Sequence, residues 1–532
     1  MKLNYSDIWR AVARRLPERP AIIAGDEVLT YRDFAGRAVR LAALLSERGI
    51  RPGDRVLLYT HNRPEQVIAL FAALALGATP VPINFRYRAA EVQELLDDSG
   101  ARAVVFAASL AEVARALPDG DVRLWLRIDD VADDGKAPTR EVPFSRIADY
   151  PDAFPVTPPG GELFLYTGGT TGRPKAVVWG AEDLLDVQMY SIYGTIGVPR
   201  PSSLDEIVRI AADPDIPSPT VLPLAPLMHG TALFTSMNTF VLGGTVVFMP
   251  EARLDPDVAV DLAQRRAVTR LILAGDAVAG PFATSAEARS ARFPSLTSAI
   301  SSGMRFSDHV KARLHALGDL VITDLLASSE GGPYAVATSR GAADLPAPLT
   351  LFPGAVVLDE EDREVQDRPG ARGRLAFRGT LPRGYHGDER KTAETFRTIR
   401  GARHVIAGDL VEVRGEGRVE LLGRGSAVVN TGGEKVFPAE VEGVLLEHPA
   451  VVDAVVFGTP DSRFGEVVTA VVAADPAGVS AEELRAHVGE RLAGYKKPRI
   501  VEIRPSLNRS PSGKVDMRRL ADEVAARPED AR

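Results

Sequence analysis

The chain has 532 residues, of which 45% are hydrophobic and 25% are charged, so a globular protein with two or more domains is expected. The formal net charge of −8 and the lack of a dense run of Lys and Arg argue against binding to nucleic acid. Cysteine is absent, which excludes disulfide bonds, thiolate metal sites and a cysteine nucleophile.

The first residues lack the basic segment and apolar run that mark a secretory leader. No later segment reaches the roughly 18 uninterrupted apolar residues of a membrane-spanning helix. We therefore expect a cytoplasmic protein without stable membrane insertion. The sequence does not indicate the oligomeric state.

The N-terminal part of the chain alternates between apolar strands and helices. Strands are expected at 55–59, 81–83 and 103–106, and helices at 64–76 and 89–98. The alternation returns around 256–274 and 307–327, which predicts α/β structure with parallel strands. The stretch 199–223 is rich in Pro, Ser and Asp, and it is expected to be a surface excursion without chemistry.

After residue 350 the pattern changes to short strands separated by turn residues, which predicts a β-rich subdomain. These strands are expected at 354–358, 373–377 and 411–422. Beyond a Gly-rich joint, helices are expected at 438–447 and 481–492, and strands at 451–457, 467–473 and 500–503. The predicted fold class is α/β, with a domain 1–423 of two α/β subdomains plus the β-rich subdomain, and a small α+β domain 424–532.

The segment 166–175, Tyr-Thr-Gly-Gly-Thr-Thr-Gly-Arg-Pro-Lys, carries the strongest chemical signal. Its three glycines let successive N–H groups converge on an anion, and its threonines and lysine add further donors. Walker spacing is absent, because Pro174 precedes the lysine and no Ser or Thr follows it. Flanking apolar strands favour a nucleotide phosphate loop over a flexible turn. Its predicted ATP-binding residues are Thr167, Gly168, Gly169, Thr170, Thr171, Gly172 and Lys175.

This loop and six further motifs, in the same order, resemble the adenylate-forming superfamily of acyl-CoA synthetases, luciferases and peptide-synthetase adenylation domains. The further motifs are Leu227-Met228-His229-Gly230, Ser328-Ser329-Glu330, Gly408-Asp409, Gly423-Arg424, Gly432-Gly433-Glu434-Lys435 and Ser512-Gly513-Lys514. The resemblance extends from Leu29 to Lys514 and is greatest to actinobacterial acyl-CoA synthetases of fatty-acid and steroid metabolism. Six motifs in register are far more specific than any one of them.

The resemblance implies a site for ATP and Mg²⁺. Glu330, together with Thr170, would hold Mg²⁺ against the triphosphate, because magnesium prefers hard oxygen ligands and few protein carboxylates. Asp409 would accept hydrogen bonds from the ribose hydroxyls, and Arg424 would reach ribose or phosphate. The remaining implied ATP-binding residues are Asp324, which would accept from the adenine amino group, and Ser329.

The resemblance also implies two half-reactions. Lys514 would swing into the site with a mobile C-terminal domain and neutralise charge that develops at the α-phosphate, so that pyrophosphate leaves and an acyl-AMP forms. A rotation of that domain would then admit the CoA thiol past Gly432 and Gly433. His229 would orient the carboxylate or pack as a partly buried histidine. The implied acid pocket contains His229, Ser302, Gly303, Met304 and Arg305.

Several positions depart from the family pattern. Leu326 and Ala327 stand where relatives have an aromatic residue and glycine, and Ser426 replaces the usual Asp or Lys of the hinge. Arg305 is charged where relatives have apolar residues beside the pocket. It faces solvent, or it holds a carboxylate on an aryl amine in a diazotase that adenylates nitrite in secondary metabolism.

We therefore expect an ATP- and Mg²⁺-dependent ligase that makes an acyl-CoA through an acyl-AMP, with a small-molecule acid and CoA as substrates. The first alternative is the ATP-dependent diazotase that adenylates nitrite and diazotises an aromatic amine. A noncatalytic nucleotide-binding relative is disfavoured, because the four polar residues that such chemistry requires are all present. These four are Glu330, Asp409, Arg424 and Lys514.

Overall fold

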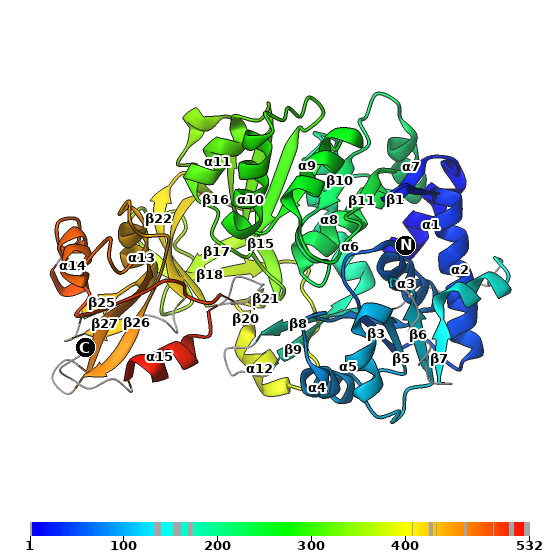
Figure 1. Cartoon of the computed structure of the whole chain (residues 1–532), viewed down its shortest axis with the longest axis horizontal. Coiled ribbons are helices and arrows are strands. Elements are labelled where there is room, and N and C mark those ends of the chain that lie inside the picture. The colour runs from blue at the N-terminus through cyan, green and yellow to red at the C-terminus, as the bar shows by residue number, and fades with distance from the viewer. Residues whose placement is uncertain are drawn as a thin grey trace. The chain divides into compact units, whose positions relative to one another are not determined.

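The computed structural model describes residues 3–131, 140–152, 161–168, 174–406, 408–424, 429–431, 434–461, 465–492, 494–509 and 515–525. The chain divides into two compact units (Figure 1). Unit 1 contains Met1–Ala347 and Arg378–Val405, and unit 2 contains Pro348–Phe377 and Ile406–Arg532. The predicted division into domains 1–423 and 424–532, placed at the Gly-rich joint, stays a prediction.

The first sheet of unit 1 is parallel and follows the predicted alternation. Its strands in spatial order are β4 (Thr79–Pro82), β3 (Arg55–Tyr59), β5 (Ala103–Ala107), β6 (Leu124–Ile128) and β7 (Glu141–Pro143). Helix α3 (Pro64–Leu76) begins with proline at its first turn and ends at Gly77, whose φ of 74° suits glycine. Helix α4 (Ala89–Ser99) joins β4 to β5, so the predicted elements here are confirmed.

A second sheet of unit 1 has parallel strands at its centre. Its spatial order is β2 (Glu27–Thr30), β1 (Pro20–Ala24), β11 (Thr245–Phe248), β10 (Thr220–Pro223), β12 (Arg270–Leu273), β13 (Ser298–Ser302), β14 (Val321–Ser328) and β15 (Gly331–Ser339). β2 and β15 pair antiparallel with β1 and β14, and the remaining pairs are parallel. The helices that connect these strands include α8 (Gly230–Val241), α9 (Pro256–Arg265), α10 (Gly275–Ala288) and α11 (Asp308–His315).

The expectation of a surface excursion at 199–223 is wrong. Helix α7 (Leu204–Ala212) lies there, and its Ile207 and Ile210 are buried in the core. Strand β10 then runs through the middle of the sheet, between β11 and β12. Most of the Pro, Ser and Asp residues flank these elements, and the side chain of Ser203 caps the helix.

A third sheet of unit 1 carries the predicted phosphate loop. Its antiparallel strands are β8 (Glu162–Gly168), β9 (Pro174–Gly180) and β19 (Gly384–Tyr385), with β9 in the middle. Helix α12 (Glu389–Thr395) follows β19, and the hairpin of β20 (Phe396–Ile399) and β21 (Ala402–Val405) follows the helix. The strands expected on both sides of the loop are confirmed.

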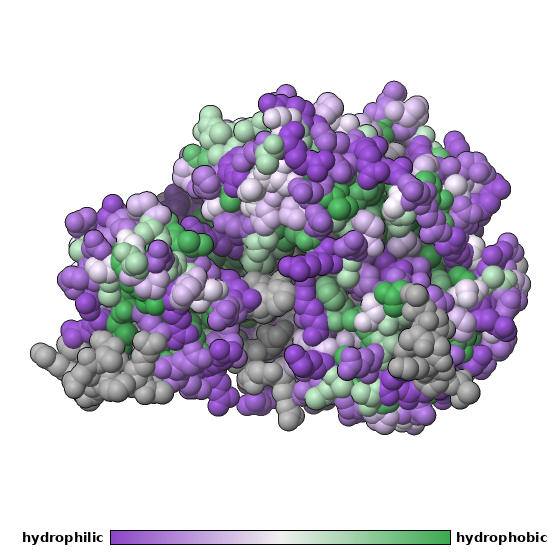
Figure 2. All heavy atoms as spheres, in the orientation of Figure 1, coloured by the Kyte–Doolittle hydropathy of each residue, from purple (hydrophilic) through white to green (hydrophobic). Residues whose placement is uncertain are grey.

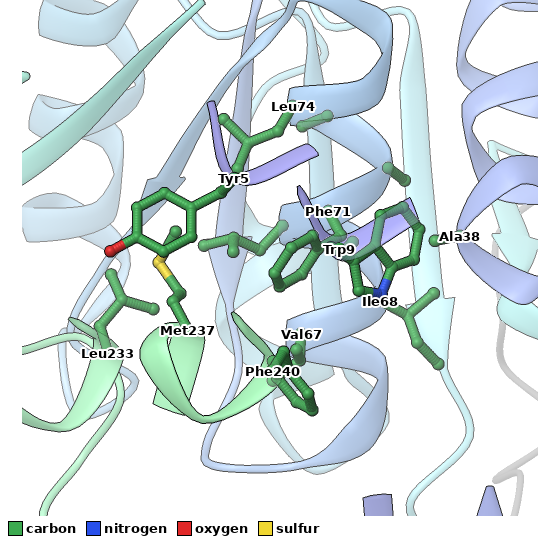
Figure 3. Close-up of a cluster of buried hydrophobic side chains, with 14 of the residues drawn as sticks. Tyr5, Trp9, Ala38, Val67, Ile68, Phe71, Leu74, Leu233, Met237 and Phe240 are labelled. Carbon is green, nitrogen blue, oxygen red and sulfur yellow. The ribbon is translucent and has the colours of Figure 1, made fainter. Parts of the chain in front are cut away.

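The largest core cluster of unit 1 lies between α3, α8, helix α1 (Tyr5–Arg15) and helix α2 (Tyr31–Glu47). Trp9 is fully buried in this cluster, and its ring centroid lies 4.9 Å from that of Phe71 and 5.1 Å from that of Phe34. Figure 3 labels Trp9 and Phe71 among the side chains of the cluster. Hydrophilic residues cover most of the face in view in Figure 2, and hydrophobic ones form small patches. No helix among the described residues has the length and apolar character that a membrane span requires.

Unit 2 has a β-rich part followed by an α+β part, in the chain order that the sequence predicts, although the prediction assigned the β-rich part to the domain 1–423. The first sheet has the antiparallel strands β16 (Leu349–Leu351), β23 (Arg418–Arg424), β22 (Asp409–Gly415), β18 (Arg372–Arg378) and β17 (Ala355–Leu358). The second has β25 (Glu434–Val436), β24 (Val429–Thr431), β27 (Gly465–Ala473), β26 (Asp453–Asp461) and β28 (Ile500–Arg504). The helices of this part are α13 (Pro438–Leu446), α14 (Ala481–Gly489) and α15 (Met517–Ala525).

Candidate active site

Strands β8 and β9 bring the two ends of the predicted phosphate loop together. Thr167 lies opposite Lys175, and Gly168 lies opposite Pro174. The Thr167 hydroxyl also donates to the Lys175 carbonyl oxygen at 3.5 Å. The loop residues predicted to bind phosphate between these strands lie outside the described residues; they are Gly169, Thr170, Thr171 and Gly172.

The Lys175 ammonium donates a hydrogen bond to the carboxylate of Asp388. Asp388 is the N-cap residue of α12, where its other carboxylate oxygen accepts from the Lys391 backbone N–H at 2.8 Å. The hydrogen bond from Lys175, together with the Lys391 N–H, lowers the pKa of Asp388. The sequence analysis missed Asp388, because an Asp before a helix signals only a cap.

Glu330 lies in the turn between β14 and β15. One of its carboxylate oxygens accepts from the Tyr385 hydroxyl at 2.8 Å. The neighbouring Ser329 accepts at its carbonyl oxygen from the indole N–H of Trp179, at 2.9 Å. Trp179 lies on β9 and Tyr385 on β19, so both predicted residues are tied to the sheet that carries Lys175.

Glu330 fits the implied magnesium site as far as the described residues define it. They contain no group of three or more His, Cys, Asp or Glu side chains placed to hold a metal ion. A single carboxylate matches Mg²⁺, which keeps several waters and binds substrate phosphates through few protein ligands. The second implied ligand, Thr170, lies outside the described residues.

Asp324 and Ser302 lie on the neighbouring parallel strands β14 and β13, where Asp324 is opposite Ser301 and Ser302 is opposite Leu325. Asp324, on β14, accepts from the buried Lys311 ammonium at 2.9 Å, and burial raises the pKa of this carboxyl group. The Ser302 hydroxyl donates to the Leu325 carbonyl oxygen at 2.8 Å. The contact of Asp324 with adenine stays a prediction. Leu326 and Ala327 continue β14, so that strand carries no aromatic residue there.

The segment 301–305, which includes predicted pocket residues, contacts the start of helix α10. The backbone N–H of Gly275 donates to the Ser301 hydroxyl at 2.9 Å, and the Asp276 N–H donates to the Arg305 carbonyl oxygen at 2.9 Å. Gly275 has a φ of 55°, and a Cβ there would lie 2.1 Å from that same oxygen. Only glycine suits this position.

The predicted pocket residues of 302–305 differ in exposure. Ser302 is buried, Met304 is half-buried, and Gly303 and Arg305 are exposed. The exposed Arg305 agrees with the interpretation that its side chain faces solvent. The Arg305 backbone carbonyl accepts from the Asp276 N–H, so the position of this residue matters for the contact between 301–305 and α10 whatever its side chain contacts.

His229 is exposed and immediately precedes helix α8, which argues against the interpretation of a packed histidine. The chain before it is held by Asn62, a residue that the sequence analysis missed. The Asn62 amide accepts from the Leu227 N–H at 2.7 Å and donates to the Pro223 and Ala225 carbonyl oxygens at 3.2 and 2.9 Å. These hydrogen bonds therefore fix the backbone of residues 223–227, which leads to His229 and the start of α8.

Unit 2 places the two predicted ribose-binding residues on neighbouring strands. Asp409 on β22 is buried and lies opposite Arg424 on β23. Gly408 and Gly423, with φ of 94° and 119°, adopt backbone conformations that favour glycine. The side chain of Arg424 and the predicted residues Ser426, Gly432, Gly433 and Lys514 lie outside the described part of the chain.

The sequence matches the family described as AMP-binding enzyme over residues 9–386 and the AMP-binding enzyme C-terminal domain over residues 440–514. The chain belongs to the AMP-binding enzyme family. The adenylate-forming superfamily predicted from the motifs is thereby confirmed.

Curated relatives of this AMP-binding enzyme are CoA ligases from actinobacteria. The medium/long-chain-fatty-acid–CoA/3-oxocholest-4-en-26-oate–CoA ligase of Mycolicibacterium smegmatis is 37% identical over 100% of this chain and 98% of its own. The 3-oxocholest-4-en-26-oate–CoA ligase of Rhodococcus rhodochrous is 34% identical over 100% of this chain and 97% of its own. These relatives support the predicted acid–CoA ligase and not the diazotase.

Solved structures agree with the fold. A Mycobacterium tuberculosis fatty acyl CoA synthetase has a TM-score of 0.71 at 25% identity, with 98% of each chain covered. ATP-bound MatB from Rhodopseudomonas palustris has a TM-score of 0.78 at 24% identity, with 100% of each chain covered. The predicted fold class is therefore confirmed.

Proposed function

We propose that this AMP-binding enzyme is an ATP- and Mg²⁺-dependent acid–CoA ligase. The substrate carboxylate attacks the α-phosphorus of ATP, the bond to the bridging oxygen breaks, and pyrophosphate leaves. The CoA sulfur then attacks the acyl carbon of the acyl-AMP, AMP leaves, and the thiol proton passes to solvent. The placement of Lys175 and Glu330 around one three-stranded sheet carries this proposal.

Lys175 and Glu330 divide the work on the triphosphate in this proposal. The Lys175 ammonium supplies positive charge to the β- and γ-phosphates, next to backbone N–H groups of the loop. Glu330 would hold Mg²⁺, which neutralises charge on the leaving pyrophosphate when it is bound. Asp324 would contact adenine, and Asp409 and Arg424 would contact ribose.

Lys514 is the proposed catalytic residue at the α-phosphate, where its charge stabilises the transition state of adenylation. Gly432 and Gly433 are proposed to line the path of the CoA thiol. The names of the relatives support a carboxylic acid with a large apolar part as the substrate. His229 at the start of α8 is proposed to orient its carboxylate.

Mass spectrometry of reactions with ATP, Mg²⁺, CoA and an acid panel tests this function. The panel contains fatty acids of increasing length, a steroid side-chain acid and aryl acids. Acyl-CoA and AMP are the expected products. AMP formation that requires nitrite and an aryl amine, with no thioester from any acid, would replace this function with the diazotase.

Lys514→Ala tests the catalytic assignment separately. It is expected to slow acid-dependent pyrophosphate release by about 100- to 1000-fold, the usual cost of removing one transition-state donor. Lys497→Ala, in the same C-terminal region, is the matched control and is expected to retain the rate. An unchanged rate in Lys514→Ala would show that this lysine has no role in adenylation.

A further inference from the structure

The segment 384–392 runs alongside the strand that carries Lys175. Tyr385 pairs with Val177 of β9, and the His386 N–H donates to the Ala176 carbonyl oxygen at 2.9 Å. The Arg383 N–H donates to the Val178 carbonyl oxygen at 2.8 Å. Backbone hydrogen bonds thus fix the start of this segment to the phosphate-loop strand.

Two side chains of the segment reach the two charged groups proposed to act on the triphosphate. The Tyr385 hydroxyl donates to Glu330 at 2.8 Å, and the Asp388 carboxylate accepts from the Lys175 ammonium. Tyr385 and Asp388 are only three residues apart, whereas Lys175 lies on β9 and Glu330 lies in the turn between β14 and β15 of another sheet. One short segment therefore contacts both groups.

Internal hydrogen bonds close this segment into a compact turn. The Tyr385 N–H donates to the Thr392 hydroxyl at 2.9 Å, and this hydroxyl donates to the Asp388 carbonyl oxygen at 2.7 Å. Gly384 packs directly on the same threonine, since a Cβ at Gly384 would lie 2.4 Å from the Thr392 methyl carbon. Tyr385 and Asp388 are consequently presented by a braced backbone.

Both contacts leave capacity for ligands. A carboxylate has two oxygens, so the bond from Tyr385 to one oxygen of Glu330 leaves the other for a cation. An ammonium has three N–H donors, so the bond to Asp388 leaves two for phosphate oxygens. Each contact also restricts the rotation of a flexible side chain before the nucleotide arrives.

We propose that the segment 384–392 is a positioning clip for the nucleotide site, in which Tyr385 orients Glu330 and Asp388 orients Lys175. Both are positioning residues, because they act through side chains that would touch the substrate. The inference rests on the proposed function and extends it by naming the residues that preorganise the triphosphate site.

Tyr385→Phe and Asp388→Asn test the clip with little change of shape. Phenylalanine keeps the ring contact with Phe396, whose centroid lies 5.9 Å away, and asparagine is also a good N-cap for α12. Each variant is expected to raise the KM for ATP about tenfold, the scale of one hydrogen bond to a charged group. At saturating ATP, the KM for the acid is expected to stay within about twofold.

Two matched variants control for general structural effects. Tyr150→Phe removes a tyrosine hydroxyl that donates to Glu47 at 2.9 Å, and Asp255→Asn alters the N-cap of α9. Both are expected to leave the KM for ATP unchanged. For Tyr385→Phe, raising the Mg²⁺ concentration is expected to restore much of the rate, because the oriented carboxylate is the proposed metal ligand.

Three results would overturn the clip. They are a KM for ATP that is unchanged or lowered in either variant, an equal rise in the KM values for ATP and acid, and a loss of rate that follows only a lower melting temperature. Failure of the proposed function is distinct, because the wild-type protein would then form neither acyl-AMP nor acyl-CoA. The variants therefore test the positioning clip once the wild-type protein is shown to form acyl-AMP and acyl-CoA.

Discussion

Asn62→Ala is expected to loosen the chain that leads into helix α8. In the wild-type protein, this one amide side chain makes three hydrogen bonds to the backbone of residues 223–227. Leu227 is fully buried and Ala225 nearly so, which leaves little access for a replacing water molecule. Truncation therefore leaves one buried N–H group and two carbonyl oxygens short of a partner.

The magnitude follows from these three bonds. An unsatisfied buried donor costs about 1–3 kcal/mol, and a carbonyl oxygen that keeps another partner loses less. The free energy of unfolding of Asn62→Ala is expected to fall by about 2–4 kcal/mol. Asn84→Ala is the matched control, because the Asn84 side chain makes one exposed bond, to the Arg86 N–H at 3.0 Å. Its expected loss is below about 1 kcal/mol.

Urea unfolding followed by tryptophan fluorescence measures this loss in the right part of the chain. The three tryptophans are Trp9, Trp125 and Trp179, and all belong to unit 1. An unchanged m value would show that the change lies in stability and not in the denatured state. The KM for the acid is expected to rise severalfold, because Asn62 holds the approach to His229, while the KM for ATP stays close to wild type.

Asn62→Asp sharpens the same prediction. Aspartate keeps the oxygen that accepts from Leu227 but places a second oxygen against the carbonyl oxygens of Pro223 and Ala225. At pH 7 this variant is expected to be no more stable than Asn62→Ala. Protonation turns that oxygen into a donor, so the deficit shrinks as the pH falls. If the free energy of unfolding falls by less than about 1 kcal/mol in both Asn62→Ala and Asn62→Asp, independent of pH, the reasoning is refuted.

Three further variants test other parts of unit 1. Gly275→Ala places a Cβ 2.1 Å from the Arg305 carbonyl oxygen at a φ of 55°. We expect its free energy of unfolding, measured by urea unfolding, to fall by more than about 2 kcal/mol. Activity assays are expected to show a higher KM for the acid. Trp9→Ala opens a cavity in the largest core cluster and is expected to cost about 3–5 kcal/mol in the same unfolding experiment. For His61, burial is the main cause that lowers the pKa. The unfolded state therefore binds more protons below about pH 6.5, and wild-type stability falls as the pH falls from 7 to 5. His61→Gln is expected to flatten that fall in melting-temperature measurements.

For each of these variants, one result would contradict the prediction. A free energy of unfolding equal to that of the wild type in Gly275→Ala would mean that the backbone at Arg305 can shift away from the new Cβ. A loss near 1 kcal/mol in Trp9→Ala would mean that the cluster closes the cavity. An equally steep pH dependence in His61→Gln would assign the wild-type loss to other groups.

Local sequence patterns determined most of the secondary structure. Hydrophobic periodicity and the flanking Pro and Gly residues predicted α3, which extends over the expected 64–76. These signals are local, because the capping residues and the apolar face lie within the same short segment. The prediction of a surface excursion at 199–223 was wrong because the central strand β10 is too short to stand out among turn residues.

The sequence by itself also predicted roles for Lys175 and Glu330, the first from a glycine-rich loop between strands and the second from the resemblance to the adenylate-forming superfamily. Only the tertiary structure identified the residues that hold them. Asp388 lies 213 residues from Lys175, Tyr385 lies 55 residues from Glu330, and Asn62 lies 165 residues from Leu227. Such pairs leave no periodic or adjacent signal in one sequence, because the packing of distant strands, and not the local chain, brings their atoms within hydrogen-bonding distance.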